Sequence, residues 1–177
     1  MESERRFFRF KMVLFGMEHV GKTSLVDRYV NDKFEESYIS TLGYNVFEKI
    51  FETEDLNIAL MIYDIGGQER FRDLRRKYAE GADIAFIVYD ITKKDSLDMI
   101  PEWQKDLVEF TDNVSFIIIG NKKDLEDIRE VSFEDGKKIS TELGALDFFE
   151  TSAKSGEGVE EAFGQLALKT YTTRFKE

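Results

Sequence analysis

Short apolar runs, each about six residues long, recur along this chain and are separated by longer segments with helical spacing. A run of this length that is apolar almost throughout is typical of a strand buried on both faces of a sheet. Such runs cover residues 10–15, 84–89 and 114–119, with a shorter one at 146–149. Helical spacing marks residues 24–30, 96–110, 132–143 and 159–171. Buried strands that alternate with helices predict a parallel sheet with helices on both faces.

Two further β-rich segments lie between the first and second of these strands. Residues 44–52 and 56–64 are separated by the acidic turn Thr53-Glu54-Asp55, which predicts an antiparallel hairpin. A charged segment that ends near Ala79 follows the hairpin and is expected to be helical. The predicted fold class is therefore α/β, with a six-stranded mixed, mostly parallel sheet and about five helices on its two faces.

The composition is that of a globular domain that buries a core. The 177 residues are 42% apolar and 34% charged, and we expect a single domain over residues 1–177. The sequence shows no membrane-spanning apolar stretch and no signal-peptide pattern. The absence of cysteine suits a reducing compartment and leaves no site for prenylation or palmitoylation in the chain as given. We therefore expect a cytoplasmic protein without a lipid anchor.

The net charge of the chain disfavours some classes of binding partner. Its 25 basic and 36 acidic residues give a net charge of −11, which disfavours nonspecific binding to nucleic acid or to an anionic membrane. The arginines and phenylalanines near the N-terminus could form a small membrane anchor. The alternation of Phe8, Phe10 and Met12 indicates the start of a strand instead, because the segment is too short for a stable amphipathic helix. A protein with a positively charged patch is the better partner.

The most specific motif is GMEHVGKT at residues 16–23, which fits the pattern G-x-x-x-x-G-K-[ST] at every position. It lies between a predicted strand and a predicted helix. Gly16 and Gly21 let successive backbone N–H groups point into the loop, and the helix start adds its positive dipole end. Lys22 supplies an ammonium for the outer phosphates, and Thr23 supplies a hydroxyl ligand for the accompanying Mg²⁺. This segment therefore predicts a nucleoside triphosphate site.

Three more polar strings follow predicted strands at their carboxyl ends, the edge where open α/β sheets bind ligands. They are DIGGQERF at residues 64–71, NKKD at 121–124 and TSAK at 151–154. Asp124 can accept two hydrogen bonds from the N1–H and the exocyclic amine of guanine, a pair that adenine does not offer. A wrong base would leave buried polar groups unpaired, which makes such a pocket selective. The expected ligand is therefore a guanine nucleotide.

Together with SYISTLGYNVF at residues 37–47, these strings resemble those of Ras-superfamily small GTPases over essentially the whole chain, most closely the Rab-like branch. The resemblance implies a monomeric P-loop G domain that binds GTP or GDP with Mg²⁺. It implies that Thr23 binds the metal, that Thr41 binds it only when a γ-phosphate is present, and that Asp64 reaches it through water. Catalysis would depend on Gln68, Lys22 and Thr41. The nucleotide-binding residues implied are Glu18, His19, Val20, Gly21, Lys22, Thr23, Ser24, Phe34, Thr41, Gly67, Asn121, Lys122, Asp124, Ser152, Ala153 and Lys154.

The resemblance also implies a mechanism. Switch one (residues 34–44) and switch two (residues 64–79) would be held by the triphosphate, through Thr41 and the Gly67 N–H, and released on hydrolysis. Gln68 would orient the attacking water. Without an internal arginine finger, turnover should be slow, nearer about 10⁻⁴ than about 1 per second. Effectors, exchange factors and activating factors would bind at the switches. The arginines expected to face such partners are Arg70, Arg72, Arg75 and Arg76.

For the base, the resemblance implies a role for each surrounding loop. Asn121 braces the loops, the aliphatic part of Lys122 lies over the base, and Phe34 packs against its other side. The backbone N–H of Ala153 meets the guanine oxygen.

Three residues depart from the family pattern. Glu18 and His19 stand where Ras-like proteins usually have small residues, and Gly66 stands where Rab proteins usually have alanine. The Gly-Gly-Gln run is similar to that of Arf-like and heterotrimeric G proteins. We expect His19 to be a solvent-facing loop residue. Glu18 either points into water or lies beside the γ-phosphate, where its charge would disfavour GTP relative to GDP.

Two alternative functions are compatible with parts of the sequence. A P-loop nucleotide kinase or ATPase would share the phosphate loop, but NKKD and TSAK would then have no explanation. A G domain that stays loaded with GTP and serves as a binding scaffold would share every string. Only the rate of turnover separates that scaffold from a switch that hydrolyses GTP.

Overall fold

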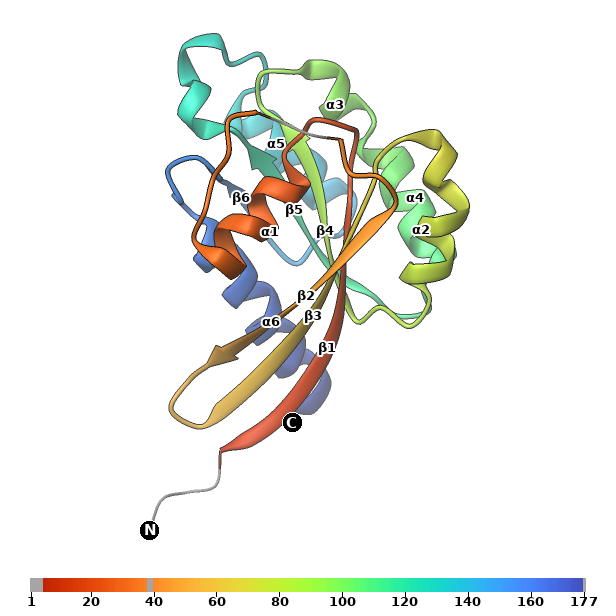
Figure 1. Cartoon of the computed structure of the whole chain (residues 1–177), viewed down its shortest axis with the longest axis vertical. Coiled ribbons are helices and arrows are strands. Elements are labelled where there is room, and N and C mark those ends of the chain that lie inside the picture. The colour runs from red at the N-terminus through yellow and green to blue at the C-terminus, as the bar shows by residue number, and fades with distance from the viewer. Residues whose placement is uncertain (1–4, 38–39, 177) are drawn as a thin grey trace.

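The computed structural model describes residues 5–37 and 40–176, so residues 38 and 39 of switch one and 1–4 of the N-terminal segment lie outside the described residues. Six strands form one sheet in the order β2-β3-β1-β4-β5-β6 (Figure 1). They are β1 (Arg6–Phe15), β2 (Tyr44–Glu52), β3 (Leu56–Ile65), β4 (Ile84–Asp90), β5 (Ser115–Asn121) and β6 (Phe148–Glu150). β2 pairs antiparallel with β3, and the other pairings in this sheet are parallel. The predicted mixed sheet is confirmed.

The described residues form six α-helices, one more than expected. They are α1 (Lys22–Asn31), α2 (Arg72–Ala79), α3 (Lys94–Asp98), α4 (Ile100–Phe110), α5 (Phe133–Glu142) and α6 (Val159–Phe175). The prediction of one continuous helix over residues 96–110 is wrong, because α3 and α4 are separate helices that meet at Met99. Pro101 lies in the first turn of α4. Its ring would clash with a carbonyl one turn earlier in a continuous helix, so a new helix begins there.

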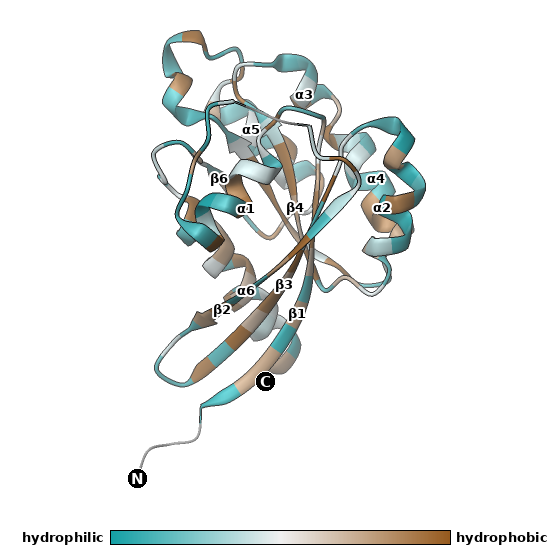
Figure 2. Ribbon diagram, in the orientation of Figure 1, coloured by the Kyte–Doolittle hydropathy of each residue, from teal (hydrophilic) through white to brown (hydrophobic). Residues whose placement is uncertain are grey.

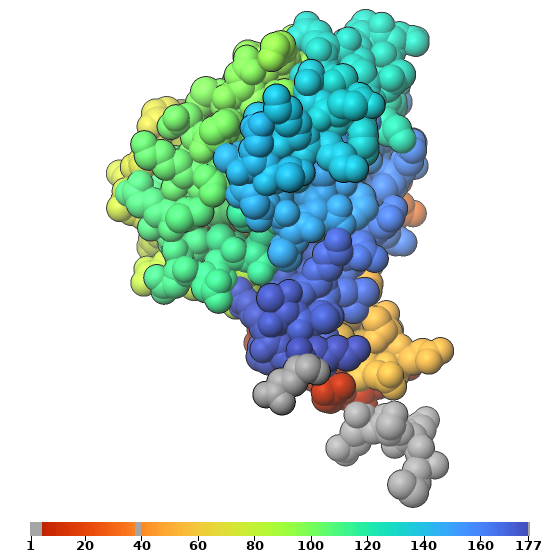
Figure 3. All heavy atoms as spheres, turned by 180° about the vertical axis from the view of Figure 1, so that it is seen from behind, coloured from red at the N-terminus to blue at the C-terminus, as the bar shows by residue number. Residues whose placement is uncertain are grey.

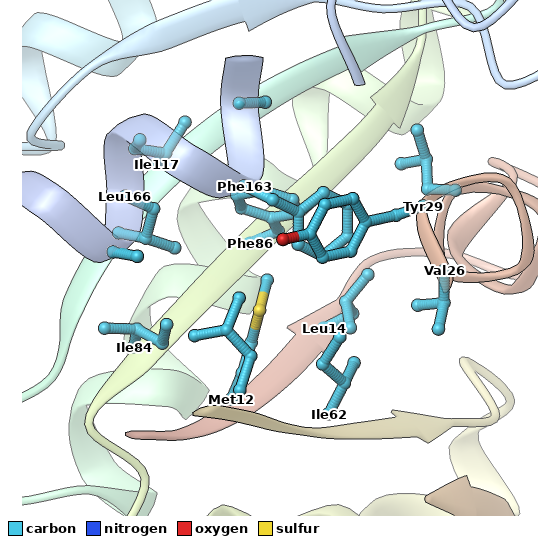
Figure 4. Close-up of a cluster of buried hydrophobic side chains, with 14 of the residues drawn as sticks. Met12, Leu14, Val26, Tyr29, Ile62, Ile84, Phe86, Ile117, Phe163 and Leu166 are labelled. Atoms are coloured by element: carbon cyan, nitrogen blue, oxygen red, sulfur yellow. The ribbon is translucent and has the colours of Figure 1, made fainter. Parts of the chain in front are cut away.

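The helices cover both faces of the sheet. α1 and α6 contribute to a core on one face, and α3, α4 and α5 contribute to a core on the other. Hydrophobic residues follow the central strands in Figure 2. Tyr29 of α1 stacks on Phe163 of α6 with 4.0 Å between the ring centroids, and Phe163 meets Phe86 of β4 edge-on at 4.6 Å (Figure 4). These contacts hold α1, and the loop that precedes it, against the sheet.

The strands β1, β2 and β3 extend beyond the rest of the sheet and form a narrow end of the molecule with the last turns of α6 (Figures 1 and 3). The ring of Phe8 lies 4.9 Å from the rings of both Tyr171 and Phe175 there. Arg6, the first residue of β1, pairs with β3, so this part of the N-terminal segment is a strand, as predicted. Among the residues described, no helix has both the length and the hydropathy to cross a bilayer.

Candidate nucleotide-binding site

The loops that follow β1, β3, β5 and β6 gather at the carboxyl edge of the sheet, away from the narrow end (Figure 1). A cavity of about 280 Å³ opens at this edge. Most of its lining was predicted from the sequence, and Glu35, Glu36 and Leu125 are additions to that prediction. The lining residues are His19, Gly21, Ser24, Phe34, Glu35, Glu36, Asn121, Lys122, Asp124, Leu125, Ala153 and Lys154.

Asn121 joins three loops around this cavity. Its Nδ2 donates a hydrogen bond to the carbonyl of Val20 at 3.0 Å. Its Oδ1 accepts hydrogen bonds from Thr151 Oγ1 at 3.0 Å and from the backbone N–H of Ala153 at 3.4 Å. Gly21 has a φ of 98°, and a Cβ there would lie 2.3 Å from Asn121 Nδ2, so glycine is required on both grounds. The structure therefore places Asn121 where the brace was expected, and the Ala153 N–H bonds to it.

Lys22 lies beneath the glycine loop and is buried. Its Nζ donates hydrogen bonds to the carbonyls of Gly16 at 2.7 Å and Met17 at 2.8 Å. Burial lowers the pKa of Lys22 to about 8, and the nearby Asp64 carboxylate partly opposes this. An ammonium carries three donors, so one N–H is left for a further acceptor such as a phosphate oxygen.

The three predicted metal ligands come together beside Lys22. Thr23 Oγ1 donates a hydrogen bond to Asp64 Oδ2 at 2.6 Å and lies 2.7 Å from Thr41 Oγ1. Asp64 is fully buried, and its Oδ1 has no hydrogen-bond partner among residues 5–37 and 40–176. Burial raises the pKa of the Asp64 carboxyl, because the charged form loses its solvation. Hydroxyl and carboxylate oxygens around a buried, unpartnered oxygen fit a small hard cation such as Mg²⁺.

Glu18 contacts both switches, so the alternative in which it points into water is wrong. Its Oε1 accepts hydrogen bonds from Ser40 Oγ at 2.5 Å and from Gln68 Nε2 at 2.8 Å. These two hydrogen bonds lower the pKa of the Glu18 carboxyl. The His19 side chain is 62% exposed, which confirms its expected position, and its Nε2 lies 3.4 Å from Glu18 Oε1.

The two glycines of switch two pack closely against neighbouring backbone. A Cβ on Gly67 would lie 2.4 Å from the carbonyl oxygen of Gly16, in the glycine loop. A Cβ on Gly66 would lie 2.8 Å from the carbonyl oxygen of Thr41, in switch one. The same Cβ would lie 2.6 Å from Cδ2 of Phe71, so glycine at position 66, where the Rab branch usually has alanine, is explained by the close approach of both the Phe71 ring and switch one.

The loops after β5 and β6 hold Asp124, the residue predicted to read the base. Ser152 is buried, and its Oγ donates a hydrogen bond to Asp124 Oδ1 at 2.8 Å. Ser152 was predicted to bind the nucleotide, but the structure places it as support for Asp124, outside the cavity lining. Lys154 Nζ lies 3.0 Å from Glu36 Oε1 in switch one.

Sequence reasoning missed the partner of Lys122. Lys122 Nζ lies 2.9 Å from Oδ2 of Asp90, which is buried at the carboxyl end of β4. Asp90 Oδ1 accepts hydrogen bonds from the backbone N–H and the Oγ1 of Thr92. Asp90 thus anchors the ammonium end of Lys122, while Lys122 lines the cavity. Its position at the end of a buried strand was the signal available in the sequence.

The prediction that all four switch-two arginines face partners is wrong for Arg75. Arg70 and Arg76 are exposed, but Arg75 is 1% exposed. Its Nη1 donates hydrogen bonds to the carbonyls of Gly66 at 3.0 Å and Gln68 at 2.7 Å. Its guanidinium lies 4.9 Å from the centre of the Trp103 ring on α4. Arg75 therefore supports the backbone of switch two from inside the protein.

A comparison with protein-family models agrees with this geometry. The model of the Ras family matches residues 11–172, which include every motif described above.

Proposed function

The chain belongs to the Ras family, and on this premise we propose that it is a molecular switch that binds GTP or GDP with Mg²⁺ and slowly hydrolyses GTP. One observation carries the proposal: three chemically distinct subsites share one edge of the sheet. They are the loop around Lys22, the oxygen cluster of Thr23, Thr41 and Asp64, and the cavity beside Asp124. Each subsite suits one part of a guanine nucleotide with its metal.

The base would be selected by Asp124. Ser152 holds Oδ1 of Asp124, and the carboxylate retains lone pairs for the N1–H and exocyclic amine of guanine. Lys122, anchored by Asp90, and Phe34 line the same cavity and would pack on the base.

The phosphates would be bound by Lys22 and the loop amides. Phosphate oxygens favour the charged form of Lys22, which burial alone disfavours. Thr23, Thr41 and Asp64 would hold the metal, which supplies charge stabilisation to the transferred phosphoryl group. Gln68, beside the glycine loop, would orient the attacking water.

The proposal is tested by nucleotide competition and by turnover. Labelled GDP bound to the purified protein should be displaced by GTP and not by a large excess of ATP. Chelation of Mg²⁺ should accelerate GDP release. Equal competition by ATP would instead support the kinase or ATPase alternative.

A scaffold that stays loaded with GTP is the second candidate. It would use the same three subsites, because holding GTP with its metal does not require any of them to promote hydrolysis. Single-turnover hydrolysis of preloaded GTP separates the two candidates, because the scaffold would show no turnover above that of the Gln68→Leu variant.

We further propose that effectors, exchange factors and activating factors bind at the switches and along the edge strand β2. Tyr44, Val46 and Ile50 on that strand are between 40% and 44% exposed, and an exposed edge can pair with another chain. The strings of the sequence support a Rab-like branch. The absence of cysteine supports a cytoplasmic location, and the resemblance to small GTPases supports a monomer.

A further inference from the structure

One carboxylate oxygen links the glycine loop to both switches. Glu18 Oε1 accepts hydrogen bonds from Ser40, next to the predicted metal ligand Thr41, and from Gln68, next to Gly67. The Glu18 side chain is only 30% exposed, and the donors approach from residues 22 and 50 positions away in the sequence. The contact is therefore part of the tertiary arrangement of the site.

The chemistry of this contact determines how the Gln68 amide is oriented. An ionised carboxylate only accepts hydrogen bonds, so Gln68 must turn its nitrogen toward Glu18 and its carbonyl oxygen elsewhere. The hydrogen bonds from Ser40 and Gln68 favour this ionised form. The amide nitrogen carries a second hydrogen, and the carbonyl oxygen is able to accept a hydrogen bond from water.

We propose that Glu18 is a positioning residue for GTP hydrolysis, which holds the Gln68 amide so that its carbonyl oxygen faces the attacking water. The inference rests on the proposed function, in which Gln68 orients that water. Glu18 acts through Gln68 and Ser40. A glutamine without this acceptor could adopt other rotamers and either amide orientation, and fewer molecules would then be ready to react.

A double-mutant cycle tests this proposal. Glu18→Ala should slow single-turnover hydrolysis of preloaded GTP by roughly five- to tenfold in the native background. In the Gln68→Leu background the same change should alter the rate by less than about twofold, because there is no amide left to position. An equal slowing in both backgrounds, an unchanged rate, or a faster rate would overturn the proposal.

Two further variants distinguish the loss of Gln68 positioning from a general loss of folding or nucleotide binding. Glu18→Gln keeps an acceptor oxygen but no longer dictates the amide orientation, so its rate should lie between those of the native protein and Glu18→Ala. Glu142→Ala removes an exposed carboxylate on α5, far from the switches, and should leave the rate unchanged. GDP affinity should stay within about twofold in all of them, which a collapsed site would not allow.

Hydrogen exchange distinguishes failure of this inference from failure of the proposed function. If the native protein binds GTP without turnover, the proposed hydrolysis fails. Glu18→Ala should still increase amide exchange at residues 40–41 and 66–71 in the nucleotide-bound protein, because both switches lose their common acceptor. Unchanged exchange there would show that Glu18 does not position the switches.

Discussion

Replacing Arg75 by alanine should destabilise this protein far more than replacing its neighbour Arg76. The change would leave the buried carbonyl of Gly66 without its donor, at a cost of about 1–3 kcal/mol. Loss of the guanidinium over Trp103 would cost about 1–2 kcal/mol more. Part of this cost is offset, because the variant no longer has to remove a guanidinium from water when it folds. The same loss of solvation lowers the pKa of Arg75. We expect a net loss of about 2–4 kcal/mol in the free energy of unfolding.

Arg76→Ala is the matched control on the same helix. Arg76 forms an exposed ion pair with Glu109 at 2.8 Å, with the two side chains 51% and 47% exposed. Such a pair contributes at most about 1 kcal/mol, and the exposed guanidinium, 4.7 Å from the centre of the Phe110 ring, adds about 0.5–1 kcal/mol. The two variants thus differ in burial while removing the same side chain.

The assay is urea unfolding in saturating GDP and Mg²⁺, with GDP affinity measured for each variant so that ligand linkage can be subtracted. Trp103 is the only tryptophan of the chain and reports on α4, but Arg75→Ala alters its surroundings directly. The unfolding midpoint is therefore measured by far-ultraviolet circular dichroism as well, and the two probes should give the same midpoint for each variant. A loss for Arg75→Ala no larger than that for Arg76→Ala would refute the proposed internal support of switch two.

Four further outcomes are expected. Asp124→Asn should shift the preference from guanine to xanthine nucleotides, since the amide can donate to the added carbonyl while its oxygen still accepts from Ser152; unchanged GDP affinity would remove Asp124 from the base pocket. Gln68→Leu should keep GTP binding but slow single-turnover hydrolysis by at least about tenfold, or roughly 1.4 kcal/mol, and equal rates would show that another group orients the water. Gly66→Ala should weaken GTP relative to GDP several-fold, because its Cβ would displace the Thr41 carbonyl at 2.8 Å; the ratio of dissociation constants measures this, and an unmoved ratio would contradict it. With no cysteine and a net charge of −11, the protein should not pellet with anionic vesicles in either nucleotide state, whereas GTP-dependent pelleting would support an N-terminal anchor.

Local patterns in the sequence were sufficient to predict the sheet and the loops whose residue types are characteristic of a ligand. The run 84–89 became β4, in which every residue is buried, because burial on both faces requires an unbroken apolar run. The glycine loop and Asp124 were predicted because phosphate and guanine each demand particular groups at short spacing, whereas Thr41 and Asp64 were predicted as metal ligands only from the resemblance to the family. Local pattern failed to predict that residues 96–110 are divided between two helices. Helical periodicity continues through Met99, whereas Pro101 favours the start of a second helix.

The tertiary structure alone decided which charged side chains support the site. Arg75 and Arg76 are adjacent in the sequence and have nearly the same sequence neighbours. Arg75 is buried because the carbonyls of Gly66 and Gln68 and the ring of Trp103 surround it after folding. Glu18 likewise acquires its partners from two segments distant in the chain. A charged group can be buried only where folding brings enough hydrogen-bond partners to replace its water, and those partners are not its sequence neighbours. The sequence therefore determined which chemistry the site can perform, and the fold determined which residues hold it in place.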